Sequence, residues 1–215
     1  MTSGKTTSLD GADYEKLCES SEDGNAAQVN QLLSMGVDPN GKGAGGMSPL
    51  YYAARNGHKD VVQLLLSAGV DPNLANSCGE TPLFWAASHG KHNVVKLLID
   101  GGANPNQANS CRETPLYWPV RKGHQDVVQV LLDEGADPRL ANSRGETPLY
   151  WAASYGHINV VKILLDAAAD PNKAMDNGFT PLHEAARSGH KDVVKLLIRA
   201  GAAPMTHEDK DRNGN

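Results

Sequence analysis

Aromatic residues, cysteines and long apolar runs are scarce in this sequence, and each scarcity excludes a class of protein. Phe, Trp and Tyr together make up 5% of the 215 residues. Three cysteines, an odd number, argue against a disulfide framework. No apolar run approaches the ~20 residues that a membrane helix needs, and the polar first ten residues are not a signal peptide. We therefore expect an intracellular protein, cytoplasmic or nuclear, although an exported effector would have the same composition.

An excess of positive charge is also lacking. The chain has 25 Asp and Glu against 20 Lys and Arg, a net charge of -5. A nucleic-acid backbone as the main partner would call for a basic stripe on the surface. We expect neither nucleic acid nor a membrane to be the partner.

What the sequence does contain is a repeat of thirty-three residues. A Pro-Leu pair recurs at this interval five times, and glycines recur in phase with it. Such self-similarity is typical of a solenoid, in which each unit buries its apolar face against its neighbours. The prolines are Pro49, Pro82, Pro115, Pro148 and Pro181.

Each unit has the signals for two helices and a turn-rich finger. Thr147 can cap a helix that begins with Pro148, and Gly156 can end it. A second helix follows from Ile158 to Asp166 with a broad apolar stripe. Asn177-Gly178 then supplies turn chemistry before the next Thr-Pro.

These features resemble the ankyrin repeat, whose signature matches best at Thr180-Pro181-Leu182-His183-Glu184-Ala185. The resemblance implies an all-α solenoid of stacked helix-turn-helix units with β-hairpin-like fingers. It also implies a non-catalytic scaffold for protein-protein interaction. We expect polar tails at 1–9 and 206–215 around a repeat domain of 10–205, with units at 10–40, 41–73, 74–106, 107–139, 140–172 and 173–205.

Three departures from the repeat have expected structural consequences. Pro119 stands inside a first helix where other copies have Ala, and should remove a backbone hydrogen bond at a cost of ~3 kcal/mol unless the helix bends. Ala168 and Arg112 replace recurring glycines. If those glycines have positive φ, each replacement costs about 1 kcal/mol.

The few aromatic residues are concentrated at two adjacent positions of the repeat. Where the signature has His, four units have Tyr51, Phe84, Tyr117 and Tyr150, which we expect to be packed inside. The resemblance implies that the next position faces a concave groove, beside variable positions one turn on. Because Trp, Tyr and Arg dominate binding hot spots, we interpret this groove as the partner site, although the rings could instead only pack between first helices. The predicted contacts are Tyr52, Trp85, His89, Trp118, Arg121, Lys122, Trp151, Tyr155 and Arg187.

A second ladder consists of Glu80, Glu113 and Glu146, each just before a helix-capping Thr. In one interpretation, each carboxylate only stabilises the start of a helix, through the helix dipole, by about 0.3–1 kcal/mol. The other is an acidic rim opposite Arg121 and Lys122 that selects a peptide of mixed charge.

No residue pattern predicts catalysis, a metal or a cofactor. Histidines at the same turn of successive units, such as His157 and His190, would lie about 10 Å apart, too far to share a zinc ion. No Ser or Cys has the in-phase base and acid of an activated nucleophile. We predict that the protein is not an enzyme and binds no cofactor.

The predicted partner is another protein or a peptide, of unknown identity. An alternative is a reader of a small or modified ligand, in which aromatic rings enclose a methylated lysine or stack on a nucleobase. The last unit lacks the polar outer face of a terminal repeat, since Val193, Val194, Leu196, Leu197 and Ile198 resemble an internal unit. We therefore expect either a piece of a longer repeat protein or a frayed last unit, and self-association through the C-terminal repeat is a further alternative.

Overall fold

The structure is a computed structural model that describes residues 11–203, so the predicted tails 1–9 and 206–215 lie outside the described residues. Residue contacts divide the chain into two compact units, 1–109 and 110–215. Their described parts, 11–109 and 110–203, are called unit 1 and unit 2 below.

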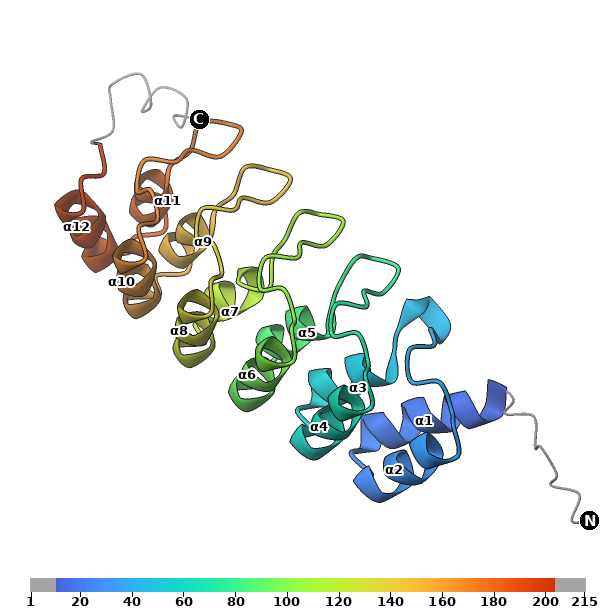
Figure 1. Ribbon diagram of the computed structural model, residues 1–215. Coiled ribbons are helices and arrows are strands. Elements are labelled where there is room, and N and C mark those ends of the chain that lie inside the picture. Colours follow the sequence, from blue (N-terminus) through green and yellow to red (C-terminus); the bar gives the residue numbers. More distant parts are fainter. Residues whose placement is uncertain (1–10, 204–215) are drawn as a thin grey trace, which may run out of the picture. The chain divides into compact units, whose positions relative to one another are not determined.

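Within residues 11–203 the regular secondary structure is entirely helical, which confirms the predicted all-α class (Figure 1). Unit 1 contains α1 (Gly11–Asp23), α2 (Ala26–Ser34), the 3-10 helix η1 (Ala44–Gly46), α3 (Pro49–Asn56), α4 (Lys59–Ser67), α5 (Pro82–Ser88) and α6 (His92–Asp100). Unit 2 contains α7 (Tyr117–Lys122), α8 (Gln125–Asp133), α9 (Pro148–Ser154), α10 (Ile158–Asp166), α11 (Pro181–Arg187) and α12 (Lys191–Arg199). In the described part of the chain, no helix has both the length and the apolar character to cross a bilayer.

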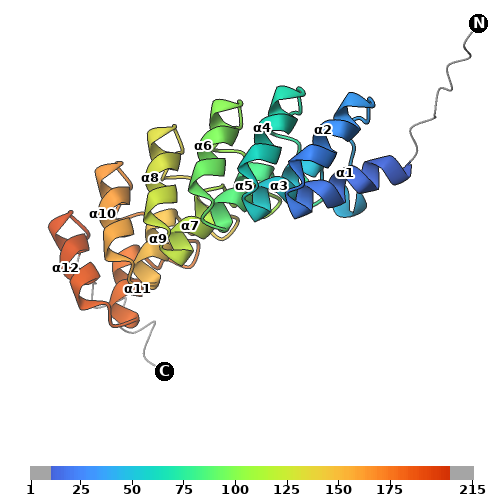
Figure 2. The same cartoon turned by 90° about the horizontal axis from the view of Figure 1, so that it is seen from below.

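Units 1 and 2 each consist of helix pairs stacked in two rows. First helices lie beside first helices, and second helices lie beside second helices (Figure 2). In unit 1, α3 packs between α1 and α5, and α4 packs between α2 and α6. In unit 2, α9 packs between α7 and α11, and α10 between α8 and α12. The core of each unit therefore forms between neighbouring pairs, as the repeat predicts.

The core is built from the same positions in successive repeats. The leucine after each repeat proline is buried, as is a valine of each second helix. The aromatic residues predicted to replace an inward histidine are buried too. They are Tyr51, Phe84, Tyr117 and Tyr150, which are at most 8% exposed.

Most first helices begin as predicted, with a hydroxyl residue at the N-cap and proline at the first position. The side chains of Ser48, Thr81, Thr147 and Thr180 each accept a hydrogen bond from the backbone N–H three residues on. Each cap satisfies one of the N–H groups that a helix start leaves unpaired, which is worth about 1 kcal/mol.

Helix α7 is the exception, and here the predicted start at Thr114-Pro115 is wrong. A turn with a 3.0 Å hydrogen bond from Tyr117 N–H to Thr114 O precedes the helix, which begins at Tyr117. Pro119 is thus the third helical residue, where a backbone N–H has no acceptor within the helix. The helix avoids the expected loss of a hydrogen bond by starting later, and it is only six residues long.

The fingers are hairpin-shaped turns, and no residue from 11 to 203 is assigned to a strand. In unit 1, Asn76 N–H donates to Glu80 O at 3.0 Å, and in unit 2 Asn142 N–H donates to Glu146 O at 3.1 Å. Neighbouring fingers of unit 2 are joined by a 3.1 Å bond from Asp176 N–H to Arg144 O. One backbone bond of this kind cannot build a sheet ladder.

The two non-glycine residues predicted to replace positive-φ glycines do have positive φ. Arg112 has φ 61° and Ala168 has φ 62°, and both lie in unit 2. Gly79 and Gly69, their counterparts in unit 1, have φ 80° and 81°. Each substitution therefore places a side chain in a conformation that costs it about 1 kcal/mol.

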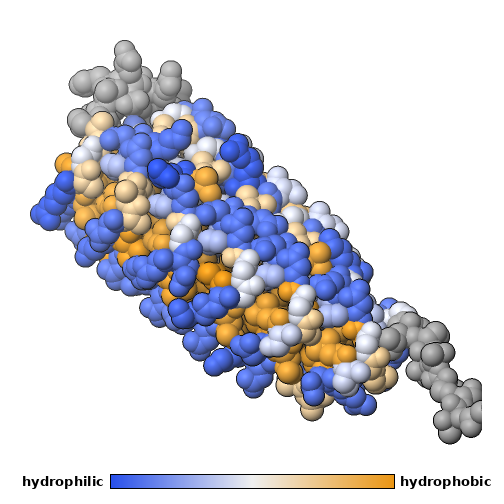
Figure 3. Space-filling model, viewed as in Figure 1, coloured by the Kyte–Doolittle hydropathy of each residue, from blue (hydrophilic) through white to orange (hydrophobic). Residues whose placement is uncertain are grey.

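Apolar surface follows the second helices in the face shown by Figure 3. In α12, Val193 and Leu197 are buried, whereas Ile198 is 55% exposed. Self-association through this repeat stays a prediction.

Candidate functional site

A cation enclosed by aromatic rings is the most distinctive side-chain arrangement of unit 2. Trp118 and Arg121 lie one turn apart on α7, while α9 supplies Trp151 and its C-cap residue Tyr155. The guanidinium carbon of Arg121 lies 4.9 Å from the ring centre of Trp118, 4.6 Å from that of Trp151 and 5.5 Å from that of Tyr155. These distances are within the range of cation–π attraction. We call these four residues the Arg121 cluster.

Hydrogen bonds fix the orientation of Arg121 inside the cluster. Its Nε donates to the Tyr155 hydroxyl at 3.0 Å, and its Nη1 donates to the Tyr117 hydroxyl at 3.4 Å. Burial opposes the charge of the guanidinium, but the bonds to Tyr155 and Tyr117 outweigh it and raise the pKa of Arg121. The side chain is therefore preorganised and permanently charged.

The cluster is partly open to solvent. Tyr155 is 44% exposed, and Trp118 and Trp151 are half-buried. Lys122 is exposed, with its ammonium group 5.4 Å from the Trp118 ring centre. Aromatic rings and two cations thus lie together at the surface on the first helices of unit 2.

The same rings also pack between repeats, so the two readings of the tryptophans are compatible. In unit 2 the ring centres of Tyr117 and Trp151 lie 5.9 Å apart in an edge-to-face contact. In unit 1, Tyr51 and Trp85 make the same contact at 5.9 Å. Edge-to-face pairs of this kind contribute about 0.5–1.5 kcal/mol beyond burial. The ladder expected across Trp85 and Trp118 spans both units and stays a prediction.

In unit 1 the counterpart of the cluster has a carboxylate partner. The indole N–H of Trp85 donates to Glu80 Oε2 at 3.0 Å. His89 packs on Trp85 with ring centres 5.5 Å apart, and Tyr52 lies against Tyr51 at 5.3 Å. The predicted contact residues of unit 1 are thus on neighbouring helices. Tyr52 lies on α3, Trp85 lies on α5, and His89 is the C-cap residue of α5.

Glu146 is buried in its finger, which differs from the expectation of an acidic rim at this residue. Glu146 is 6% exposed, and its Oε2 accepts from Asn142 Nδ2 at 2.6 Å and from Arg144 Nη2 at 3.0 Å. This oxygen is therefore engaged within its own finger. Glu80 is likewise bonded to Asn76 Nδ2 at 2.8 Å, and both Glu80 and Glu113 are half-buried.

Arg144 explains a difference between the two units. Arg144 occupies the repeat position of Cys78, and it binds the carboxylate that a tryptophan binds in unit 1. The indole N–H of Trp151 is buried and has no hydrogen-bond partner among the residues described. A buried donor without an acceptor costs about 1–3 kcal/mol.

Sequence reasoning missed Glu184, which occupies the ladder position of Trp151 one repeat later. This carboxylate is 3% exposed and accepts hydrogen bonds from Tyr150 at 3.3 Å and Ser154 at 3.2 Å. Arg187, predicted as a partner contact, is paired to it at 2.5 Å. Burial opposes ionisation of Glu184, but Arg187 and the hydroxyl donors prevail and lower its pKa. The signal was the replacement of an aromatic by an acid within the repeat register.

Histidines at the turns join neighbouring repeats. His58 Nε2 lies 2.8 Å from Glu22 O, and His190 Nε2 lies 2.9 Å from Ser154 O. No group of three His, Cys, Asp or Glu side chains within residues 11–203 could hold a metal ion. The three cysteines form no disulfide.

Comparisons with known proteins agree on one family. A family model described as "Ankyrin repeats (3 copies)" matches residues 17–76, 60–142 and 134–208. Among solved structures, the chain is similar to an ankyrin repeat domain of Acinetobacter baumannii AYE, with a TM-score of 0.82 and 26% sequence identity. That match covers 87% of this chain and 98% of the other. A comparison with curated protein sequences found no match.

Proposed function

Because the chain belongs to the ankyrin repeat family, whose members generally bind proteins, we propose that it is a non-catalytic scaffold whose Arg121 cluster contacts a protein or peptide partner. The observation that carries the proposal is the enclosure of the Arg121 guanidinium by three rings at 4.6–5.5 Å.

Three properties of the cluster support a binding role. Trp, Tyr and Arg are the residue types that contribute most to interface hot spots. Their side chains are held by mutual contacts, so little conformational entropy is lost on binding. Tyr155 is 44% exposed, and hence contributes a large aromatic surface to a partner.

The occupied cation position favours a protein partner over methylated lysine. A methyl-lysine cage needs open ring faces around the ligand's cation. In unit 2, Arg121 already lies over Trp118, Trp151 and Tyr155. Unless Arg121 leaves, the cluster offers its outer edges and hydroxyl groups to a peptide instead.

The test is a selection of peptides from a displayed random library on the intact chain, followed by calorimetric titration of the best binder. We expect Tyr155→Ala to weaken that binder at least roughly 30-fold, which corresponds to the ~2 kcal/mol of a hot spot. Tyr155 caps the end of α9 and is largely exposed, so the variant should fold.

The matched control is Lys195→Ala, which removes an exposed side chain of α12 whose ammonium group lies 3.1 Å from the exposed carboxylate of Asp192. It should bind like the unaltered chain. Equal affinity of Tyr155→Ala and the unaltered chain would contradict the cluster as the contact site. A parallel tryptophan-fluorescence titration with trimethyl-lysine peptide and nucleotides checks the alternative reader function, and saturable binding there would favour it.

A further inference from the structure

Asparagine side chains fasten neighbouring repeats at the loop after the second helix. Asn73 Oδ1 accepts from Asn104 N–H at 2.7 Å, and its Nδ2 donates to Gly102 O at 3.0 Å. In unit 2, Asn172 accepts from Ala203 N–H at 2.7 Å and donates to Gly201 O at 3.0 Å. We call this pair of bonds the asparagine bridge. One carboxamide thus satisfies a backbone donor and a backbone acceptor of the next repeat.

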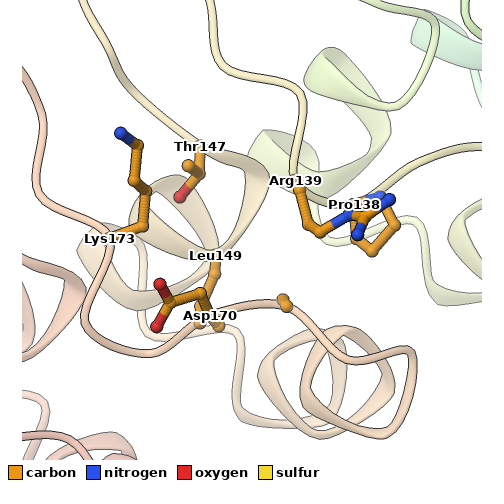
Figure 4. A pocket seen from close by; sticks show the side chains of 7 residues that line it. Pro138, Arg139, Thr147, Leu149, Asp170 and Lys173 are labelled. Atoms are coloured by element: carbon orange, nitrogen blue, oxygen red, sulfur yellow. The ribbon is translucent and has the colours of Figure 1, made fainter.

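One bridge in unit 2 is missing because its asparagine is replaced by Arg139. By the repeat register, Arg139 should contact the N–H of Asp170 and the C=O of Ala168. Instead its Nε and Nη2 donate to Asp137 at 2.8 and 3.0 Å, within its own loop. Figure 4 shows its side chain over Pro138, extending away from Asp170. No hydrogen bond within the described residues reaches the Asp170 N–H or the Ala168 carbonyl.

A pocket lies where the bridge is missing. Its volume is about 190 Å³, several times the ~30 Å³ that one water molecule occupies in the liquid. The lining is mostly apolar, with Leu149 at its centre in Figure 4. The residues that line it are Pro138, Arg139, Thr147, Leu149, Ala169, Asp170 and Lys173.

The charges around the pocket balance. Arg139 is neutralised by Asp137, and the pKa of Asp137 is lowered by the hydrogen bonds that Arg139 donates. Lys173 and Asp170 contribute one charge of each sign. A neutral, dipolar ligand group therefore fits this setting better than an ion, which would bring a net charge to an apolar pocket.

We propose that this pocket binds the carboxamide side chain of an asparagine or glutamine in a partner protein, which replaces the missing asparagine bridge. The carboxamide oxygen accepts from the Asp170 N–H, and its NH₂ group donates to the Ala168 carbonyl. A carboxylate cannot do this because it has no donor for that carbonyl. The pocket shares no residue with the Arg121 cluster, so either proposal can fail while the other stands.

The experiment is a nuclear magnetic resonance titration of the ¹⁵N-labelled full chain. The probes are acetyl-Gly-Asn-Gly-N-methylamide and the same peptide with Asp or Ala in place of Asn. We expect a saturable shift of the Asp170 amide signal with the Asn peptide, and at least a tenfold weaker affinity for the other two. Equal effects of the Asn and Asp peptides, or no saturable shift at Asp170, would overturn the proposal.

Two variants of one residue supply the controls. Arg139→Asn should rebuild the bridge from within, abolish the shift and raise the thermal midpoint by roughly 2–4 °C. Arg139→Ala leaves the pocket open and should keep the binding of the Asn peptide. Retained binding in Arg139→Asn, with no gain in its thermal midpoint, would show that the pocket is not the gap of a missing bridge.

Discussion

Units 1 and 2 place related side chains at equivalent repeat positions, yet their tryptophans are held by different partners. In unit 1, Trp85 donates its indole N–H to Glu80. In unit 2, Arg144 takes the corresponding Glu146, and Trp151 is instead covered by the guanidinium of Arg121. One substitution in a finger therefore changes the environment of a ring on the first helix.

Departures from the repeat also gather in unit 2. Unit 2 contains Pro119, Arg112, Ala168 and Arg139. Each replaces a residue type that favours the local backbone structure or hydrogen bonding at the equivalent positions of unit 1. The same unit carries the Arg121 cluster and the pocket beside Arg139. Natural proteins often have reduced local stability at functional sites, so this distribution agrees with the proposal that the binding residues lie in unit 2.

The largest expected effect concerns Glu184, an acid at the position where unit 1 has Tyr52 and Trp85. Glu184→Ala should lower the free energy of unfolding by about 2–3 kcal/mol, because it removes charge-assisted hydrogen bonds from Tyr150 and Ser154. Urea denaturation monitored by circular dichroism measures the loss. The exposed pair of Asp192 and Lys195 is the control, since Lys195→Ala should change stability by less than about 0.5 kcal/mol.

The same carboxylate predicts the direction of a pH dependence. The pKa of Glu184 is lower in the folded chain than its usual value of 4.5. Its contribution is therefore complete above that value and is lost as the pH falls through the folded-state pKa. Thermal midpoints should fall more steeply on acidification in the unaltered chain than in Glu184→Gln. Parallel curves for the two chains would refute this assignment.

The next effect compares the two indole N–H groups directly. Trp85→Phe and Trp151→Phe remove similar ring volume, but only the first removes a hydrogen bond to a carboxylate. Trp85→Phe should therefore be more destabilising than Trp151→Phe by about 1.5–3 kcal/mol. Equilibrium urea unfolding of both variants measures the difference. If Trp151→Phe costs as much or more, the Trp151 N–H is not without a partner.

The smallest effect concerns backbone strain. Ala168→Gly should stabilise the chain by about 1 kcal/mol, because glycine adopts φ 62° without strain. The reverse change in unit 1, Gly69→Ala, should destabilise by a similar amount, since no atom lies within 4 Å of an added Cβ there and only the conformation differs. Thermal unfolding of both variants provides the measurement. Changes of the same sign would contradict the explanation.

Local sequence signals predicted the scaffold well. The hydroxyl caps, the buried Tyr51, Phe84, Tyr117 and Tyr150, and the positive φ of Arg112 and Ala168 all follow from rules within one repeat. The later start of α7 was not predicted, because two prolines, Pro115 and Pro119, compete to set the first turn. Which donor pairs with which finger glutamate could not be predicted either, because Asn142 and Arg144 meet Glu146, and Trp85 meets Glu80, only in three dimensions.

The missing asparagine bridge at Arg139 has a consequence for how unit 2 opens. Repeats are coupled only to their neighbours, so opening begins where that coupling is weakest. The junction between the loops after α8 and α10 lacks both bridge bonds and includes the strained Ala168. A ligand that ties these loops together would slow amide hydrogen exchange on both sides of the junction and make unit 2 unfold more cooperatively. Ligand binding in one small pocket would then affect the unfolding of all the stacked helices in that unit.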